Sequence, residues 1–182
     1  HQIEDDGTGY KTQHRQDLLW SDDTNFRPVD LEFAPDGSLY FVDWHNILVG
    51  HMQHNARDPY RDHAHGRIYR ITYPGRPLIA QIDFSKLSVE ETLETLKLPE
   101  YRTRYRAKRV LRGKDKKEVS RALKIWVKNL DDIVSNYEHH ILEALWVSWG
   151  LNDIDTDILN LAMKAIDYRV RAAAVRAIRY NK

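Results

Sequence analysis

The spacing of apolar residues changes near residue 85, and this change constrains the fold more than any other feature of the sequence. Residues 8–84 contain short runs in which apolar and polar residues alternate, separated by Gly, Pro, Asp and Asn. Such runs are typical of β-strands. Residues 88–182 place apolar residues three and four apart, which is typical of amphipathic helices. The sequence therefore predicts an α+β chain, with a β part in residues 1–84 and a helical part in residues 85–182.

The β part predicts a small antiparallel meander. VDLEFA (29–34) and GRIYRITY (66–73) alternate, whereas LYFVD (39–43) is mostly apolar and is expected to be buried on both faces. Residues 10–21 could form an outer strand and residues 77–84 a further one. This spacing is typical of one blade of a β-propeller. A single sheet has two faces and two edges to cover, so we expect the helices or additional β-structure to cover it.

The helical part carries clear start and stop signals. Ser88 and Glu91 form the pattern of a capping box at the start of the first helix. Pro99 is expected at the first position of the next helix, and Gly113 just after its end. Four more helices are predicted, over residues 115–130, 137–151, 155–166 and 168–180.

An internal repeat links two of the predicted helices. YRTRYRAKRVLR (101–112) and YRVRAAAVRAIR (168–179) lie 67 residues apart and share one tyrosine, one alanine and four arginines in register. Repeated short helices indicate an α-helical solenoid of HEAT type. The matched arginines have two interpretations, which the sequence leaves open. They form a solvated face with ion pairs inside each helix, or a basic surface for an anionic or acidic partner.

Residues 44–65 form a long loop between two predicted strands. Loops longer than about 12–15 residues in compact domains are usually functional or disordered. This loop contains large apolar residues that can anchor it, so we expect it to be ordered. It also concentrates histidine, aspartate and arginine, and three interpretations of these residues stay open.

The first interpretation is a metal site, because imidazoles bind transition metals and carboxylates bind calcium. The second is a catalytic or ligand-orienting site, in which a neutral histidine acts as general base and arginines hold an anion. The third is a polar network in which Asp43, Asp58 and Asp62 fix the loop through hydrogen bonds. The candidate residues are His51, His54 and Arg61 for catalysis, Asp43, Arg57, Asp62 and Arg67 for ligand binding, and His63 and His65 for a metal.

Composition excludes several other classes of function. The formal net charge is +1 with histidine neutral, so the overall basic field of a nucleic-acid-binding protein is missing and no nucleic-acid partner is expected. No apolar run approaches the roughly 20 residues of a membrane-spanning helix. The chain has no cysteine, which excludes disulfides, zinc–thiolate sites and a CxxCH haem attachment within it.

The run FRPVDLEFAPDGSLYFVDWHN, continued by GHMQHNARDPYRDHAHGRIYRITYPGRP, resembles the last part of the propeller in a family of exported bacterial proteins. These proteins are described as membrane-bound dehydrogenases with PVC-type haem-binding domains. Their propeller is similar to that of pyrroloquinoline-quinone-dependent sugar and sorbosone dehydrogenases. PEYRTRYRAKRVLR and NYEHHILEALWVSWGL resemble the HEAT-like region that follows it.

The resemblance implies a periplasmic or cell-envelope oxidoreductase, of which this chain is a fragment covering the last blade and the HEAT-like region. It implies pyrroloquinoline quinone (PQQ) and calcium as cofactors of the full-length protein, and a c-type haem in a separate domain. The implied partners are the remaining propeller blades and that cytochrome c domain. In the usual strand order, the histidine-rich loop would border the ligand-binding face. The alternative is a non-catalytic scaffold whose HEAT-like surface docks a protein partner.

Overall fold

The computed structural model describes residues 1–48 and 57–181, and within them the chain is α+β. Its described part holds five β-strands, followed by six α-helices and two short 3-10 helices. The chain divides into two compact units. One, the sheet unit, comprises residues 1–32 and 39–71; the other, the helical unit, comprises residues 33–38 and 72–182. Each unit is described separately below.

A two-stranded hairpin opens the sheet unit. β1 (Gln2–Asp6) pairs in antiparallel fashion with β2 (Gly9–Gln13), and Asp6 faces Gly9 across the turn. Gly7 has φ +62°, a conformation that glycine adopts without steric cost. β1 has no counterpart among the predicted strands, although Asp-Gly is a strong hairpin signal. Of the strand predicted over residues 10–21, only the part up to Gln13 forms a strand, and residues 14–21 have no regular structure.

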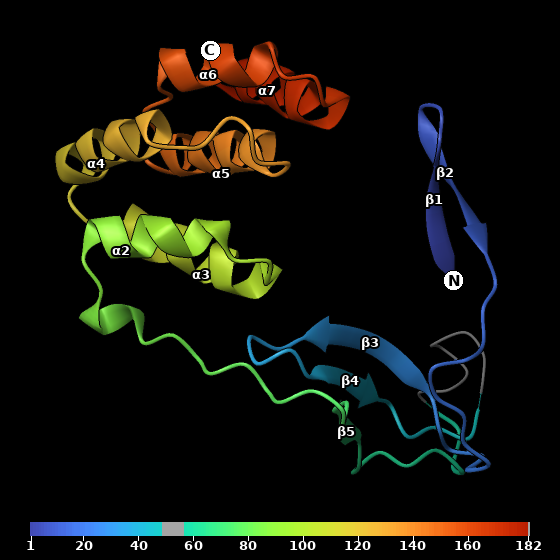
Figure 1. Cartoon of the computed structure of the whole chain (residues 1–182). Helices are drawn as coiled ribbons and strands as arrows, with labels where there is room; N and C mark the ends of the chain where they lie inside the picture. Colours follow the sequence, from blue (N-terminus) through green and yellow to red (C-terminus); the bar gives the residue numbers. More distant parts are fainter. Residues whose placement is uncertain (49–56, 182) are drawn as a thin grey trace. The chain divides into compact units, whose positions relative to one another are not determined.

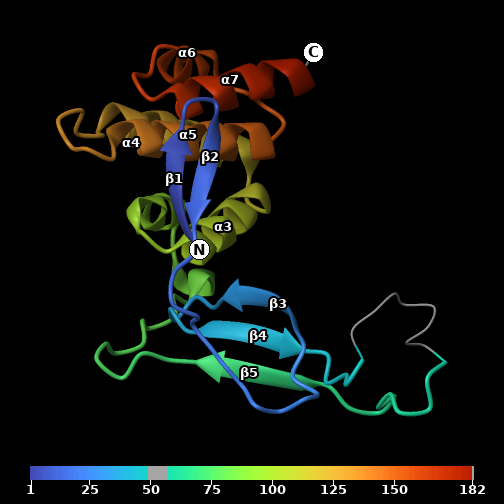
Figure 2. The ribbon, with the colours of Figure 1, turned by 90° about the vertical axis from the view of Figure 1, so that its right-hand side faces the viewer.

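The second sheet contains the three predicted central strands. β4 (Leu39–Asp43) lies between β3 (Pro28–Phe33) and β5 (Arg67–Ile71), as Figure 2 shows. β4 is buried on one face only: Leu39, Phe41 and Asp43 are buried, while Tyr40 and Val42 are exposed. The expectation that this strand is buried on both faces was therefore wrong. The apolar composition of β4 suits a strand with both faces covered, but the described residues do not cover the face that carries Tyr40 and Val42.

Residues 77–84 do not form the further strand that alternation suggested. The segment runs without regular structure into a 3-10 helix, η1 (Phe84–Lys86). Ile79 donates its backbone N–H to the carbonyl of Asp36 at 3.0 Å instead of joining a strand ladder. Alternation of apolar and polar residues is expected of a half-buried strand, but it does not make a strand by itself. The segment must also pair with the edge of a neighbouring strand, and the spacing of residues does not show whether such an edge is near.

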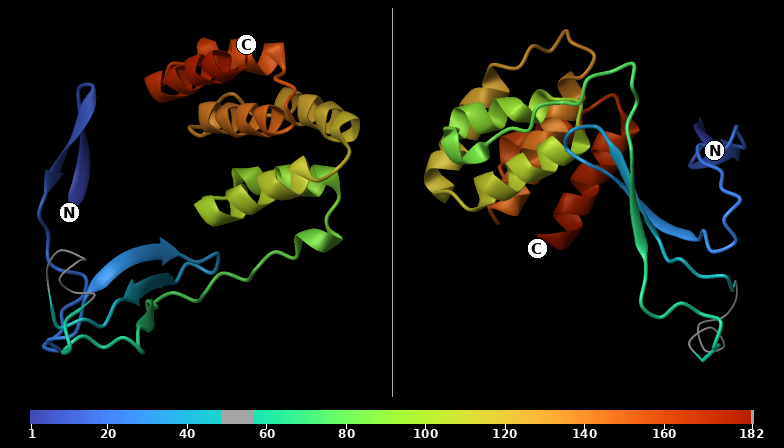
Figure 3. Two further views of the ribbon diagram at one scale, coloured as in Figure 1. Left: turned by 180° about the vertical axis from the view of Figure 1, so that it is seen from behind. Right: turned by 90° about the horizontal axis from the view of Figure 1, so that it is seen from below.

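The helical unit stacks its helices in layers of two, which Figures 1 and 3 show from opposite sides. The first layer pairs α2 (Val89–Glu94), which continues as η2 (Thr95–Lys97), with α3 (Tyr101–Arg112). The second pairs α4 (Lys116–Lys128) with α5 (Tyr137–Gly150), and the third pairs α6 (Thr156–Met163) with α7 (Tyr168–Tyr180). Between layers, α2 packs on α4, α3 packs on α5, and α5 packs on both α6 and α7. A continuous hydrophobic core runs through them.

The capping signals were partly right. Ser88 and Glu91 form the predicted capping box, with both reciprocal hydrogen bonds present. Pro99 is not at the first helical position, because Glu100 is the N-cap and α3 begins at Tyr101. Gly113 is the C-cap but has φ −87°, so α3 ends without the left-handed residue that a glycine there suggests.

The sequence repeat is also a repeat of contacts. Arg104 donates through Nη1 to the carbonyls of Leu98 (2.8 Å) and Pro99 (2.6 Å). Arg171, 67 residues later, donates through Nη1 to the carbonyls of Ala165 (2.7 Å) and Ile166 (2.6 Å). Each arginine thus satisfies two carbonyls in the short link that joins the preceding helix to its own helix. These two arginines bind the chain itself, while the HEAT-type solenoid stays a prediction.

A buried carboxylate ties the first layer to the second. Glu143 on α5 is only 4 % exposed. It accepts hydrogen bonds from Arg104 Nε at 2.9 Å and Lys108 Nζ at 2.5 Å, both from α3. Two cations on one helix therefore compensate the one buried charge on its neighbour. None of the described helices is both long and apolar enough to cross a membrane.

Candidate functional site

Asp43 is the centre of the polar cluster that the sequence pointed to. It is the last residue of β4, is 0 % exposed, and faces Arg67 directly in the β4–β5 register. Its Oδ1 accepts hydrogen bonds from the backbone N–H of Arg27 (2.7 Å) and of His45 (2.9 Å). Its Oδ2 accepts from Arg67 Nε at 2.7 Å. One carboxylate therefore joins three segments that are far apart in the sequence.

Arg67 extends this cluster to a second carboxylate. Its Nη1 donates to Asp23 Oδ2 at 2.5 Å, so the guanidinium bridges Asp23 and Asp43. Burial alone would raise the pKa of Asp43, but the two backbone donors and Arg67 outweigh it, so this pKa lies below its ordinary value. The hydrogen bond from Arg67 likewise lowers the pKa of Asp23. Both carboxylates are therefore ionised at neutral pH, and both already bind a cation.

Three aromatic rings pack beside the Asp43–Arg67 pair. Phe41 and Tyr69 face each other across β4 and β5 and stack with their ring centroids 4.9 Å apart. Phe26 packs edge-on against Phe41 at 6.0 Å. The guanidinium of Arg67 lies 5.7 Å from the centroid of the Tyr69 ring. These rings limit the movement of the ion pair, because the charged groups sit at the border of a packed apolar face.

A second carboxylate organises the C-terminal part of the loop. Asp62 accepts hydrogen bonds through Oδ1 from the backbone N–H of Ala64 (2.8 Å) and His65 (3.0 Å). Its Oδ2 lies 2.7 Å from His65 Nδ1 and 3.6 Å from His45 Nε2. Asp62 thus lies between two imidazoles, one from each end of the loop.

His45 and the residue after it combine three unusual features. Its φ is +54°, in the left-handed region that residues other than glycine seldom adopt. Its Nδ1 is buried and has no hydrogen-bond partner among the described residues. Asn46, the next residue, is also buried, and its Nδ2 is in the same situation. These two nitrogens, like the Nε atoms of Arg27 and Arg61, are buried groups that find no partner among the described residues and remain free for a polar ligand.

The structure brings some of the predicted site residues together and leaves others apart. Asp43 and Arg67 bind each other, and Asp62 binds His65. Arg61 places its guanidinium 4.8 Å from the centroid of the Trp44 ring. Arg57 and His63 are exposed. His51 and His54 lie outside the described residues, so their predicted catalytic roles stay predictions.

The described residues contain no group of three or more His, Asp or Glu side chains that could hold a metal ion. His65 binds Asp62, and His63 is exposed. The metal role predicted for His63 and His65 remains a prediction, because His51 and His54 of the same loop lie outside the described residues.

Asp23, His45 and Asn46 belong to this cluster but were not among the predicted site residues. Asp23 is 44 residues from Arg67, and no spacing rule connects such a pair. His45 and Asn46 follow β4 directly, in the sequence DWHN. The available signal was their position, since residues on loops that regular structure holds in place often carry function.

We expect acid to release the Asp62 contacts. Hydrogen bonds from the Ala64 backbone and the His65 side chain lower the pKa of Asp62 from 3.8 to about 2. A carboxylate with a lowered folded-state pKa stabilises the fold above its unfolded pKa, and loses this effect as pH falls through the folded value. The amides of Ala64 and His65 should therefore exchange faster, relative to intrinsic rates, as pH falls from about 4 to about 2. Asp62→Asn should remove this dependence; an unchanged profile in that variant would contradict it.

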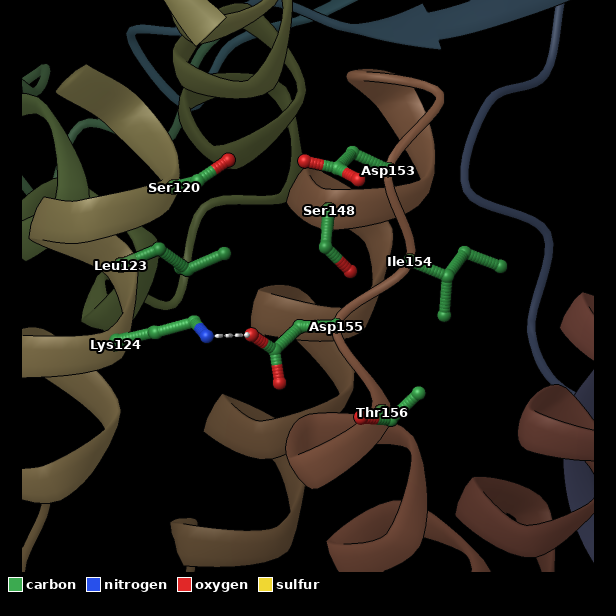
Figure 4. A pocket seen from close by; sticks show the side chains of 8 residues that line it. All are labelled: Ser120, Leu123, Lys124, Ser148, Asp153, Ile154, Asp155 and Thr156. Carbon is green, nitrogen blue, oxygen red and sulfur yellow. Dashed lines mark ion pairs between the residues drawn. The ribbon is translucent and has the colours of Figure 1, made fainter. Parts of the chain in front are cut away.

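The helical unit has a separate hollow of about 240 Å³ between α4, α5 and the start of α6, shown in Figure 4. Lys124 and Asp155 meet in it at 3.1 Å. Asp155 also accepts hydrogen bonds from the backbone N–H of Asp157 and Ile158, which caps α6. The charged groups of this hollow therefore bind one another and the helix end, and the sheet-unit cluster remains the better candidate site.

A comparison with protein families links the sheet unit to a known domain. A family model described as "Domain of unknown function (DUF7133)" matches residues 1–75. This range contains all five described strands and the loop, and none of the helices. No curated protein matches the chain. No solved structure matches it either. The chain is thus similar over its first 75 residues to a domain whose function is not assigned.

Proposed function

We propose that residues 1–84 are the last blade of a larger β-propeller, in a periplasmic dehydrogenase that resembles the PQQ-dependent sugar dehydrogenases. In this proposal, electrons pass to a c-type haem in another domain of the same protein. Residues 85–182 then correspond to the HEAT-like region after the propeller. The observation that carries the proposal is the exposure of apolar side chains on both faces of the β3–β4–β5 sheet.

One face of this sheet borders a hollow of about 470 Å³, which is lined mainly by apolar side chains. Val29 and Leu31 of β3 line it and are exposed, together with Leu18 and Leu19 from the preceding segment. Surfaces of this kind usually mark a contact with another structural element. A neighbouring blade would cover such a face, because propeller blades pack face to face around a central axis.

The opposite face is apolar as well. Tyr40 and Val42 on β4 are exposed, and Ile68, which pairs with Val42 from β5, is 74 % exposed. The β1–β2 hairpin adds two further strands, of which every residue except Gly9 is exposed. An isolated two-stranded hairpin is only marginally stable in water. Additional strands beside the hairpin and the sheet would stabilise the hairpin and cover the exposed apolar face of the sheet.

The described residues do not by themselves fit a complete PQQ or calcium site. Asp23, Asp43 and Asp62 all accept hydrogen bonds from within the chain, and no metal-binding group of three is present among the described residues. In the proposal, this chain contributes a border of the ligand site. Its available groups are Arg61, His45 and Asn46, while the remaining contacts come from other blades.

The coding sequence on either side of the chain gives the first test. Further propeller blades before residue 1 and a CxxCH motif after residue 182 would support the dehydrogenase. A free-standing reading frame would contradict it.

The second test measures dye reduction by sugars in the polypeptide that includes the flanking segments, with added PQQ and calcium. We expect Arg61→Ala to raise the KM at least about tenfold, since a lost charge-assisted contact is worth about 1.5–3 kcal/mol. Arg61→Lys should recover part of the loss. Lys11→Ala, in the exposed hairpin, is the control and should leave the activity unchanged. No PQQ-dependent dye reduction in the unmodified protein would refute the proposed activity.

A non-catalytic scaffold is the second candidate, and one observation favours it. The ionised groups at the centre of the cluster, Asp43, Arg67 and Asp62, all bind partners within the chain. The sole role of such a network can be to fix a long loop. In that case the unmodified protein would show no dye reduction, and the Arg61 variants would change only the exchange rates of the loop amides.

A further inference from the structure

The third helical layer repeats the first. A shift of 67 residues relates Ser88, the N-cap of α2, to Asp155, the N-cap of α6. The same shift relates Arg104 to Arg171, which make matching hydrogen bonds to backbone carbonyls. Positions of equal role in the two layers can therefore be compared directly.

In the first layer, the next layer covers one face of α3 and of η2. Leu111 on that face of α3 is 0 % exposed. Arg104 Nε and Lys108 Nζ reach across to Glu143 of α5. Lys97 places its ammonium 5.6 Å from the centroid of the Trp126 ring of α4. Apolar contact, a buried carboxylate and a cation over an aromatic ring together hold these layers.

In the third layer, the equivalent positions are open. Ile178 stands at the position of Leu111 and is 47 % exposed, and Val175 stands at the position of Lys108 and is 54 % exposed. Arg171 keeps the two carbonyl contacts of Arg104 through Nη1, while the described residues offer its Nε no acceptor. Lys164, at the position of Lys97, is exposed. We name Lys164, Arg171, Val175 and Ile178 the terminal face.

We propose that the terminal face docks a further pair of helices of the α4–α5 kind, which presents a carboxylate to Arg171 and apolar side chains to Val175 and Ile178. The interface between the first and second layers provides the chemistry, because three of its four positions (Lys97, Arg104 and Leu111) recur in the third layer with the same character. The fourth differs: Val175 replaces Lys108. The docked carboxylate therefore meets one cation instead of two, and apolar contact contributes more. This inference is independent of the proposed dehydrogenase activity.

The repeat defines a direct test. Because Arg179 matches Arg112, residues 113–151 can be placed after Arg179 in the otherwise complete chain, which adds a copy of α4 and α5 in register. We expect the Tm to rise by at least about 5 °C, since a gain of 1 kcal/mol shifts the Tm of a chain this size by about 2–4 °C. Amides of α7 should exchange at least about tenfold more slowly.

Ile178→Glu in the extended chain should abolish both the rise in Tm and the slower exchange of the α7 amides, because it places a charge in the docked interface. In the unextended chain the same change should leave the Tm nearly unaltered, since Ile178 is exposed there. Arg176→Glu, on another side of α7, is the matched control and should keep the gain. An extension that leaves the Tm and α7 exchange unchanged would overturn the proposal. So would a dimer of the unextended chain, seen by sedimentation, that Ile178→Glu dissociates, because a second copy would then occupy the face.

Discussion

Replacing Asp43 with alanine is expected to cost the sheet unit about 2–3 kcal/mol of its unfolding free energy and to release the start of the loop. The substitution leaves the backbone N–H groups of Arg27 and His45 without their acceptor, and removes the buried partner of Arg67. Breaking a buried ion pair on one side costs about 3–5 kcal/mol. The expected value is lower because Arg67 is partly exposed and keeps Asp23 as a partner.

Hydrogen exchange of the β4 and β5 amides, analysed by mass spectrometry, would measure this loss. Asp43→Asn is the matched control, because it keeps an oxygen for the two backbone donors and removes the charge and the acceptor that Oδ2 offers to Arg67. It should cost clearly less than alanine. Equal exchange rates in the alanine variant and the unmodified chain would show that the cluster does not hold the loop.

The second large effect is expected from Glu143→Ala, at about 3 kcal/mol in the helical unit. Arg104 and Lys108 would then lie beside an apolar layer with no carboxylate between them. Removing one member of a buried ionic network leaves the remaining charges uncompensated, which costs about 3–5 kcal/mol. Thermal unfolding followed by circular dichroism should show a Tm lower by roughly 6–12 °C.

Glu143→Gln tests whether charge or shape is responsible, since it can still accept one hydrogen bond. It should recover less than half of the loss. Glu118→Ala, on the exposed side of α4, should change the Tm by less than about 2 °C. A Glu143→Ala variant as stable as the Glu118→Ala variant would mean that apolar packing alone joins the layers.

Local chemistry allowed the helices to be predicted more accurately than the strands. Ser88 and Glu91 lie three residues apart, and the capping box they form involves only one turn of backbone. The 67-residue repeat was equally visible, and its contacts proved to be repeated as well. The hairpin strand β1 was missed, and residues 77–84 were assigned a strand they do not form, because pairing depends on which edges meet in space.

In the candidate site, too, local features could be predicted from the sequence, whereas contacts between distant residues could not. The sequence alone showed that residues 44–65 are a long connection rich in ionisable groups, and one of the three interpretations it left open was a polar network held by Asp43, Asp58 and Asp62. Only the tertiary structure decided that Arg67 joins Asp43 to Asp23, and that Asp62 lies between His45 and His65. A charge restricts the type of partner but not its position, since partners 17 to 44 residues apart in the sequence are brought together only by the folding of the sheet.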